Sequence, residues 1–324
     1  MHEPIDIVYT WVDGADPTFL YNVQHWQQQL RVDVAESDIR CHRFRNNQEL
    51  RYSLRSVEKF MPWIRHIYIV TNGQKPSWLQ FDQQRLIHIA HEQLFPNPQD
   101  LPTFNSNAIE MHLHRIPGLS RRYLYLNDDL FLGRPVPRAA FIPLRGSIFY
   151  LEPIPVHADP HHGRVHDRAY ASTQQWLRRL WPDSELPFLP AHCPQLYDRD
   201  LVAELESQCQ EPWHRTSSHR FRSADDLVLR IAYAGWRKAR RDVHLEMLTW
   251  GSSRYSLLIL ERKWRPLLKA MYRLRFHTPQ FFCLNDDLAD SRQDRLILFC
   301  LRRLLSALYP TRSVYETDRA SGLD

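Results

Sequence analysis

Two short acidic motifs in this chain each follow an apolar run. Asn127-Asp128-Asp129 follows RYLYL, and Asn285-Asp286-Asp287 follows FFCL. Adjacent carboxylates repel one another unless a cation neutralises them, so such a pair is costly without a partner. Mg²⁺ and Mn²⁺ favour oxygen ligands and commonly combine one or two carboxylates with substrate phosphates. The motifs predict metal or substrate contact; for the second, a helix N-cap at Asn285 or Asp286 is the alternative.

A basic segment, RFRNNQELRYSLR (43–55), offers groups for an anionic ligand. Arg51 and Arg55 lie one helical turn apart, where two planar guanidinium groups can clamp a diphosphate. A helix that starts at Asn46 or Asn47 also attracts anions to its first turn. The alternative is a solvated arginine face that pairs with Glu58.

Two histidine-containing segments are candidates for acid–base or metal chemistry. His192 lies in the apolar, proline-bounded stretch Ala191–Pro194, ahead of Arg220-Phe221-Arg222. This position indicates a general base or an oriented hydrogen-bond donor. The alternative is a structural histidine. Residues 157–167 hold four histidines and two aspartates. Zinc binding is conceivable there, but without a helical frame a mobile polar loop is the favoured interpretation.

Composition limits the class of protein. The 324 residues are 43% hydrophobic and 24% charged, which fits one large or two modest globular domains. Of 42 basic residues 37 are arginine, and the net charge is +5, so an anionic partner or an arginine-favouring genome is indicated. The five dispersed cysteines form no C-x-x-C pair, which favours a reducing compartment. No apolar run spans a bilayer and no secretory signal is visible, so we expect a soluble cytoplasmic protein.

The first 135 residues alternate between strand and helix patterns. Strands are predicted at 5–11, 66–71, 85–91 and 122–127, and helices from 46 or 47 to 61 and from 105 or 106 to about 118. This order predicts an α/β fold with an open, mostly parallel sheet and helices on both faces. Ligands of such sheets bind outside the carboxyl ends of the strands, where 11–13 and 127–129 would meet.

The rest of the chain is predicted to complete one catalytic domain, 1–324. Residues 1–135 would form its α/β half, which the family resemblance described below implies to be the nucleotide-sugar-binding half, and the proline-rich residues 136–220 a loop-rich insert or lid. Residues 221–324 would be mainly helical, with a helix at 223–236 capped by Ser223. Two basic amphipathic stretches, 254–275 and 291–308, would pack on the domain or lie on an anionic membrane surface.

Four segments resemble the signatures of the Stealth family of sugar-phosphate transferases. IDIVYTWVDGADP (5–17) resembles the first, and residues 43–79 with 101–133 resemble the long second. The segments around 192–194 and 220–222 look like the third, and FFCLNDDLADS (281–291) like the fourth. The family includes bacterial capsule polymerases and the eukaryotic N-acetylglucosamine-1-phosphotransferase α/β subunit; this chain is similar to the compact bacterial members.

The resemblance implies a nucleotide-diphosphosugar-transferase-like (GT-A-like) fold. It also implies transfer of hexose 1-phosphate from a nucleotide sugar to a glycan hydroxyl, as in capsule or surface polysaccharide synthesis at the inner membrane. Functional positions would be Asp128, Asp129, the 285–287 segment, His192 and Arg222. We hypothesise that the donor is held by Tyr9, Thr10, Trp11, Asp13, Gly14, Arg51 and Arg55, and that Mg²⁺ or Mn²⁺ binds Asp128, Asp129, Asn285 and Asp287.

Three rival functions remain at this point. A metal-dependent glycosyltransferase of the same fold would attack the anomeric carbon instead of phosphorus. A nucleic-acid-binding module would need arginines and stacking aromatics on one face, whereas the aromatics here lie mainly in strand-like runs. A catalytically inactive relative would be expected to lack a polar motif residue, and none is missing. We expect a nucleotide-sugar donor and a glycan acceptor, and no nucleic acid.

Overall fold

The central sheet of the computed structural model has five strands. The model describes residues 3–31, 45–144, 146–157, 159–260, 263–288 and 291–317. The strand order is β3-β2-β1-β4-β8, comprising Leu86–Ala90, Ile67–Thr71, Ile5–Thr10, Arg122–Asn127 and Gln195–Asp198. The first four strands are parallel and β8 is antiparallel to β4. The predicted α/β fold with an open, mostly parallel sheet is confirmed.

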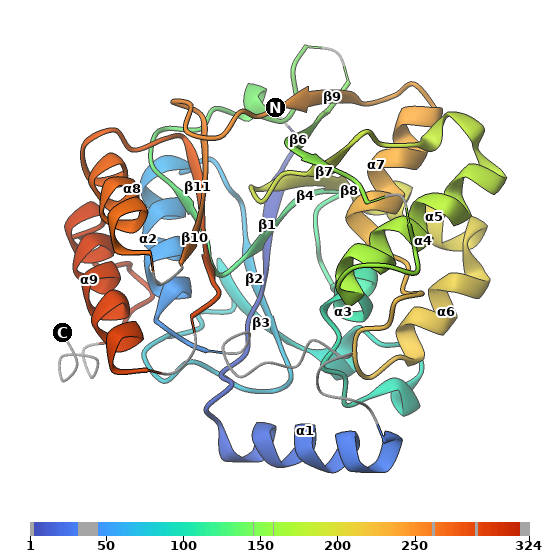
Figure 1. The fold of residues 1–324 in the computed structure, drawn as a ribbon, viewed down its shortest axis with the longest axis horizontal. Coiled ribbons are helices and arrows are strands. Elements are labelled where there is room, and N and C mark those ends of the chain that lie inside the picture. Colours follow the sequence, from blue (N-terminus) through green and yellow to red (C-terminus); the bar gives the residue numbers. More distant parts are fainter. Residues whose placement is uncertain are drawn as a thin grey trace.

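Helices cover both faces of this sheet, because successive strand side chains point to opposite sides. Val8, Tyr68 and Tyr123 face one core, which is closed by helices α3–α7. Ile7 and its neighbours face a second core, closed by α2 (Glu49–Phe60). In Figure 1 these two groups of helices lie on opposite sides of the sheet. The helices of the first group are α3 (Ser106–His112), α4 (Val165–Leu180), α5 (Arg199–Gln208), α6 (Gln210–Ser218) and α7 (Leu229–Ala239).

Two smaller sheets flank the central one. One has the order β10-β11-β5 (Tyr255–Leu260, Phe281–Asp286 and Leu130–Leu132), and the other β7-β6-β9 (Phe188–Pro190, Ile148–Pro155 and His244–Met247). Outside the first sheet lie α8 (Trp264–Phe276) and α9 (Arg292–Leu308), which share a core with Tyr52 of α2. Helix α1 (Pro17–Leu30) lies at the lower edge in Figure 1. Short 3₁₀ helices lie at His91–Gln93, Pro98–Asp100, Leu113–Arg115, Arg138–Ala140 and Pro182–Ser184.

Local signals account for several helix ends. Asn105 and Asp198 accept backbone N–H bonds at the starts of α3 and α5, and Ser291 with Asp294 forms a capping box at the start of α9. Helix α2 begins only after Gln48, which has a positive φ of 66°, so neither Asn46 nor Asn47 caps it directly.

Three predictions about the later chain are wrong. Residues 136–220 are not a loop-rich insert, because they contain three strands and three helices and supply β8 to the central sheet. The helix predicted from Ser223 begins only at Leu229, because the Ser223 backbone N–H instead donates to Asp226 in a turn. Residues 255–260, predicted as part of an amphipathic helix, form the strand β10, whose branched and aromatic residues pair with β11.

Within the described ranges, no helix is both long and apolar enough to cross a bilayer.

Candidate active site

The first acidic motif lies in the turn between β4 and β5, at the carboxyl end of the central sheet. The parallel register places Thr10 beside Asn127, so the loop after β1 and the Asp128-Asp129 turn are neighbours. The Leu284 backbone N–H donates to the Asp129 carbonyl at 3.1 Å, which places β11 beside the same turn. The predicted meeting of segments 11–13 and 127–129 is confirmed, and the strand that carries the second acidic motif joins them.

The Asp128 and Asp129 carboxylates of this turn have too few positively charged partners to neutralise them. Burial raises the pKa of Asp128, and the nearby Glu49 and Asp129 carboxylates raise it further. Burial also raises the pKa of Asp129, partly offset by His192. Asp129 Oδ2 accepts from the Cys283 thiol at 3.4 Å, whereas its buried Oδ1 has no hydrogen-bond partner in the described chain. A cation would supply what this turn lacks, so the donor set fits a bound divalent ion.

Glu49, the first residue of α2, is a third carboxylate of this region. It is 5% exposed, and its oxygens accept from the backbone and side-chain amides of Asn47 at 2.6 and 2.8 Å. Burial raises its pKa to about 7, against the lowering effect of the Asn47 hydrogen bonds. Glu49 is therefore part protonated near neutral pH.

His192 is held by a buried carboxylate. Its Nδ1 lies 2.7 Å from Oε1 of Glu152, which is 0% exposed on strand β6. Oε2 of Glu152 accepts from the Tyr255 hydroxyl at 2.7 Å and from the Trp250 indole at 3.3 Å. Burial would raise the pKa of Glu152, but hydrogen bonds from His192, Tyr255 and Trp250 lower it overall. Glu152 is therefore an acceptor-only carboxylate, which places a proton on Nδ1 and leaves Nε2 free to act.

Arg222 stands at the amino end of α3, where its Nη2 donates to the Ser106 hydroxyl at 2.6 Å. Glu110 on the same helix interacts electrostatically with Arg230, Arg222 and His192, while burial raises its pKa. His192 and Arg222 both lower the pKa of Glu110, and His192 also lowers that of Asp129, so these groups are close enough to interact electrostatically.

The second acidic motif approaches the same region but does not complete a metal site. Asp286 accepts from Arg45 at 3.0 Å and from the Asn47 amide at 3.2 Å. Asn285 and Asp287, by contrast, are exposed. Among the residues that the structure describes, no group of three or more histidine, cysteine or carboxylate side chains is arranged to hold a metal ion. The predicted ligand set thus reduces to Asp128 and Asp129, and Asp287 is not brought into it.

Four conserved regions of Stealth proteins match this chain in order. They are region 1 at residues 3–24, region 2 at 43–148, region 3 at 191–233 and region 4 at 272–322. The chain belongs to the Stealth family. Most residues of the site described above lie within or close to one of these regions, whereas Trp250 and Tyr255 lie between regions 3 and 4.

Named relatives agree with the Stealth assignment. Two exopolysaccharide phosphotransferases of Streptomyces coelicolor are each 34% identical across 97% of this chain. The chain spans about half their length, 52% and 57%. N-acetylglucosamine-1-phosphotransferase subunits alpha/beta of Mus musculus is 49% identical over 147 residues, 44% of this chain and 12% of the mouse protein.

One solved structure is distantly similar to the Stealth chain. The galactosyltransferase LgtC aligns over 95% of this chain and 98% of its own with 11% identity and a TM-score of 0.45, which is too low to bear on function.

Two arginines predicted to clamp a diphosphate have other partners in this Stealth chain. Arg55 Nε and Nη2 donate to Glu316 at 2.6 and 2.8 Å, and the Arg51 Nε lies 3.6 Å from the same carboxylate. Arg51 Nη1 also donates to Gln48 at 2.7 Å. These contacts tie α2 to the carboxyl-terminal segment, so the structure gives the arginines a stabilising role and does not support the diphosphate role.

The end of β1 and the loop after it, residues 9–14, have buried and accessible parts. Tyr9 is 0% exposed and its hydroxyl bonds Ser53 at 2.7 Å, and Trp11 is buried in the same core. Their side chains are structural, contrary to the predicted donor contact. Thr10, Asp13 and Gly14 are only partly buried, and Asp13 is braced by Gln74. These three remain candidates for donor binding.

The histidine-rich segment 157–167 does not form a site. His162 Nδ1 contacts Asp159 at 2.5 Å on the surface, and residues from Val165 onward begin α4. Ala158 lies outside the described residues.

Sequence reasoning overlooked three carboxylates: Glu49, Glu110 and Glu152. Glu152 carried a usable signal, because it is the one charged residue in the apolar strand Phe149-Tyr150-Leu151-Glu152. A buried charge persists only where partners satisfy it, so such a residue indicates a functional or structural polar centre.

Proposed function

We propose that this chain transfers a hexose 1-phosphate from a nucleotide-diphosphate sugar to a hydroxyl group of a glycan. The new bond joins the acceptor oxygen to the sugar-bearing phosphorus, and the bond from that phosphorus to the bridging oxygen breaks, releasing a nucleoside monophosphate. The observation that carries the proposal is the hydrogen bond between the partly exposed His192 and the buried Glu152, since His192 also lowers the pKa of Asp129 at the carboxyl end of β4. A histidine that is oriented by a carboxylate and lies near the Asp128–Asp129 turn is suited to removing a proton next to a metal-bound pyrophosphate.

The names of the relatives support the same reaction class. Both Streptomyces coelicolor proteins are called exopolysaccharide phosphotransferases, and the mouse protein is called an N-acetylglucosamine-1-phosphotransferase. We extend this class of activity to the present chain, with a surface polysaccharide as the acceptor.

We propose that Asp128 and Asp129 hold one divalent ion, Mg²⁺ or Mn²⁺. Two carboxylates suffice for Mg²⁺ when substrate phosphates and water supply the remaining ligands. Bound there, the ion would neutralise charge on the donor pyrophosphate and on the transferred phosphoryl group. The unpartnered Asp129 Oδ1 and the raised pKa values of both aspartates support this assignment.

We assign His192 as the general base that removes the proton of the acceptor hydroxyl. Glu152 fixes its Nδ1 proton and ring orientation, and the Nε2 lone pair takes the hydroxyl proton as the oxygen attacks phosphorus. The His192 side chain is 24% exposed, so a substrate can reach it. Arg222 is assigned to the phosphoryl oxygens, with Ser106 holding one of its nitrogens in place. Thr10, Asp13 and Gly14 are assigned to the nucleoside side of the donor.

The released nucleotide tests the reaction. UDP-, GDP- and CDP-sugars are incubated with a glycan acceptor, and nucleotides are quantified together with ³¹P NMR of the product. Nucleoside monophosphate and a phosphodiester signal are expected. Release of a diphosphate without phosphorus in the product would establish the rival glycosyltransferase reaction instead. His192→Ala and Arg222→Ala are each expected to lower turnover by about 10²–10³, and turnover near wild type in either folded variant removes that residue from the mechanism.

We also propose that α8 and α9 contact an anionic membrane surface. Leu268, Tyr272 and Phe276 form a stripe on α8 and are each more than half exposed, with Arg265 and Arg275 beside them. Apolar side chains flanked by arginine are suited to an anionic bilayer interface. Sedimentation with phosphatidylglycerol vesicles is expected to fall for Phe276→Glu and to be unchanged for Tyr21→Glu on α1. Equal binding of both variants would refute this contact.

A further inference from the structure

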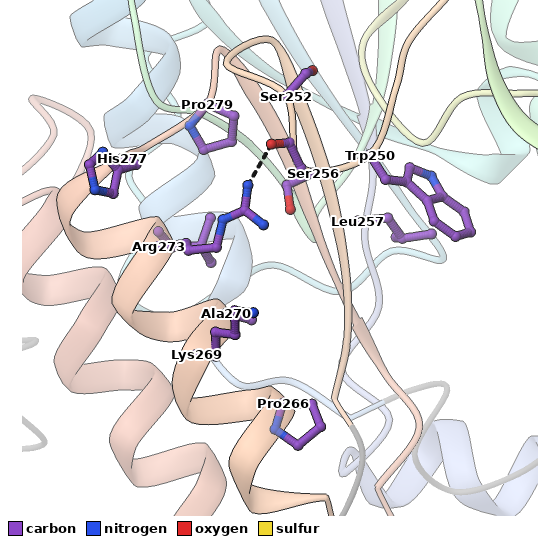
Figure 2. A pocket seen from close by; sticks show the side chains of 12 residues that line it. Trp250, Ser252, Ser256, Leu257, Pro266, Lys269, Ala270, Arg273, His277 and Pro279 are labelled. Carbon is purple, nitrogen blue, oxygen red and sulfur yellow. Dashed lines mark hydrogen bonds between the residues drawn. The ribbon is translucent and has the colours of Figure 1, made fainter.

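A surface groove lies between α8 and the strand β10, away from the residues assigned to the reaction. Its volume is about 350 Å³, and its walls come from the turn at 250–252, from β10 and from α8. Figure 2 shows the Arg273 guanidinium reaching from α8 toward that turn, where its Nη2 donates to the Gly251 carbonyl at 2.5 Å. Gly251 has a positive φ of 69°, and a Cβ at this position would lie 3.0 Å from the Arg273 Nη2. The glycine therefore permits both the turn and the close approach of the arginine.

The groove is cationic. Lys269 and Arg273 are four residues apart and therefore lie on one face of α8, and His277, the residue after the helix, lines the groove beyond them. No aspartate or glutamate is among the described residues that line the groove. Arg273 donates to the neutral backbone carbonyl of Gly251, so its charge is not neutralised by that bond. Lys269 and Arg273 are separated by about 6 Å along the helix axis, which suits an extended chain that carries repeated negative charges.

One wall of the groove touches the catalytic pair. Trp250 lines the groove, is 46% exposed and donates its indole N–H to Glu152 Oε2 at 3.3 Å. The other oxygen of Glu152 holds His192. Only the Glu152 side chain therefore separates Trp250 at this end of the groove from His192, the group assigned to deprotonate the acceptor. A half-exposed indole at that end offers a flat apolar face on which a sugar ring can stack.

We propose that this groove binds a phosphate-bearing segment of the acceptor glycan, next to the hydroxyl that reacts at His192. Lys269 and Arg273 bind the phosphodiester oxygens, and Trp250 contacts an intervening sugar. This inference rests on the proposed function, because that reaction leaves a phosphodiester in each product. A chain that has already been extended then binds better than an unmodified glycan of equal length.

The test measures binding without turnover. The full chain is titrated with phosphorylated dextran oligosaccharides and with neutral dextran of the same length, and dissociation constants are determined at two salt concentrations. Tighter, salt-sensitive binding of the phosphorylated chain is expected, and Lys269→Gln/Arg273→Gln is expected to weaken it roughly tenfold or more. Arg265→Gln, an exposed charge on α8 outside the groove, is the matched control and is expected to bind as wild type.

Specific outcomes would overturn the proposal. They are equal affinity for the two dextrans, unchanged affinity in the double variant, or the same loss in Arg265→Gln. If Arg273→Gln lowers the melting temperature, Lys269→Gln alone is used to measure the affinity, because Lys269 is an exposed side chain. If the double variant loses phosphatidylglycerol vesicle binding and keeps its affinity for phosphorylated dextran, the groove belongs to the membrane contact and the proposal is wrong. Nucleotide release from the donor is measured separately, so failure of the reaction is distinguishable from failure of the groove.

Discussion

Nδ1 of His192 lies 2.7 Å from Oε1 of Glu152, a carboxylate with no exposed surface that is 40 positions earlier in the chain. The Tyr255 hydroxyl joins the pair by donating to Glu152 and accepting from the His192 backbone N–H at 3.1 Å. Both the tautomer and the orientation of the imidazole therefore depend on one buried glutamate.

Replacement of Glu152 by glutamine is expected to lower kcat by about 10²–10⁴ and to leave the donor KM nearly unchanged. An amide presents a donor to Nδ1 and so favours the wrong tautomer. Steady-state kinetics with the identified donor measures the effect, and His192→Ala/Glu152→Gln is expected to be no slower than His192→Ala alone. The control is Glu206→Gln, which disrupts the equivalent His114–Glu206 pair outside the site. Equal losses in both glutamine variants would show a structural role only.

Substitution of Asp129 by asparagine is expected to raise the stability of the protein and to lower its activity. It removes a buried charge whose Oδ1 has no hydrogen-bond partner, so without metal the variant is expected to be about 1 kcal/mol more stable than wild type. Turnover is expected to fall at least 10²-fold. Chemical unfolding in EDTA and turnover with Mg²⁺ provide the two readings.

Divalent metal is expected to stabilise the wild type. Ligand at ten times its dissociation constant adds about 1.4 kcal/mol to the free energy of unfolding. Melting temperatures recorded during Mg²⁺ and Mn²⁺ titrations are expected to rise for wild type and to stay flat for Asp128→Asn and Asp129→Asn. A wild-type protein indifferent to both ions would exclude the two-aspartate metal site.

Glu49 is expected to make stability depend on pH in the direction opposite to an ordinary ion-paired carboxylate. Burial raises its pKa from the ordinary value of 4.5 to about 7, so the folded state keeps a proton that the unfolded state releases. Its contribution to stability is complete below pH 4.5, declines as pH rises to about 7, and is constant above that. The free energy of unfolding of wild type minus that of Glu49→Gln, measured in EDTA from pH 4 to 8, is expected to fall over this window by up to about 1.4 kcal/mol per pH unit. A pH-independent difference would contradict the assignment.

Arg55 is expected to behave as a stabilising residue. Its carboxylate partner, Glu316, is 1% exposed and also accepts from the Ser313 backbone N–H. Removal of one partner of a buried ion pair costs about 3–5 kcal/mol, so Arg55→Ala is expected to lower the free energy of unfolding by that order. Arg55→Ala/Glu316→Ala is expected to recover part of the loss, as measured by urea unfolding. A stable Arg55→Ala with a greatly raised donor KM would restore the diphosphate role.

Strand and helix patterns near the amino terminus were predictable because local physical chemistry specifies them. The β-branched and aromatic runs at 5–10, 67–71 and 122–127 form β1, β2 and β4, and their alternation determines which side chains face each core. Prediction failed where local signals conflict with packing. The prolines of 136–220 indicated loops, yet Gln195–Asp198 extends the central sheet because its backbone completes the edge of β4.

The sequence by itself determined the acidic turn after β4 and the family of the chain, and it identified His192 as a candidate, since each is carried by contiguous residues. Only the tertiary structure decided which groups those residues meet. Glu152 of β6 is joined to His192 in the loop between β7 and β8, β11 is brought beside Asp129, and Arg55 is tied to Glu316 at a separation of 261 positions. Such partnerships depend on how sheets and helices pack, because the free energy of satisfying a buried charge is set by neighbours in space and not by neighbours in the chain.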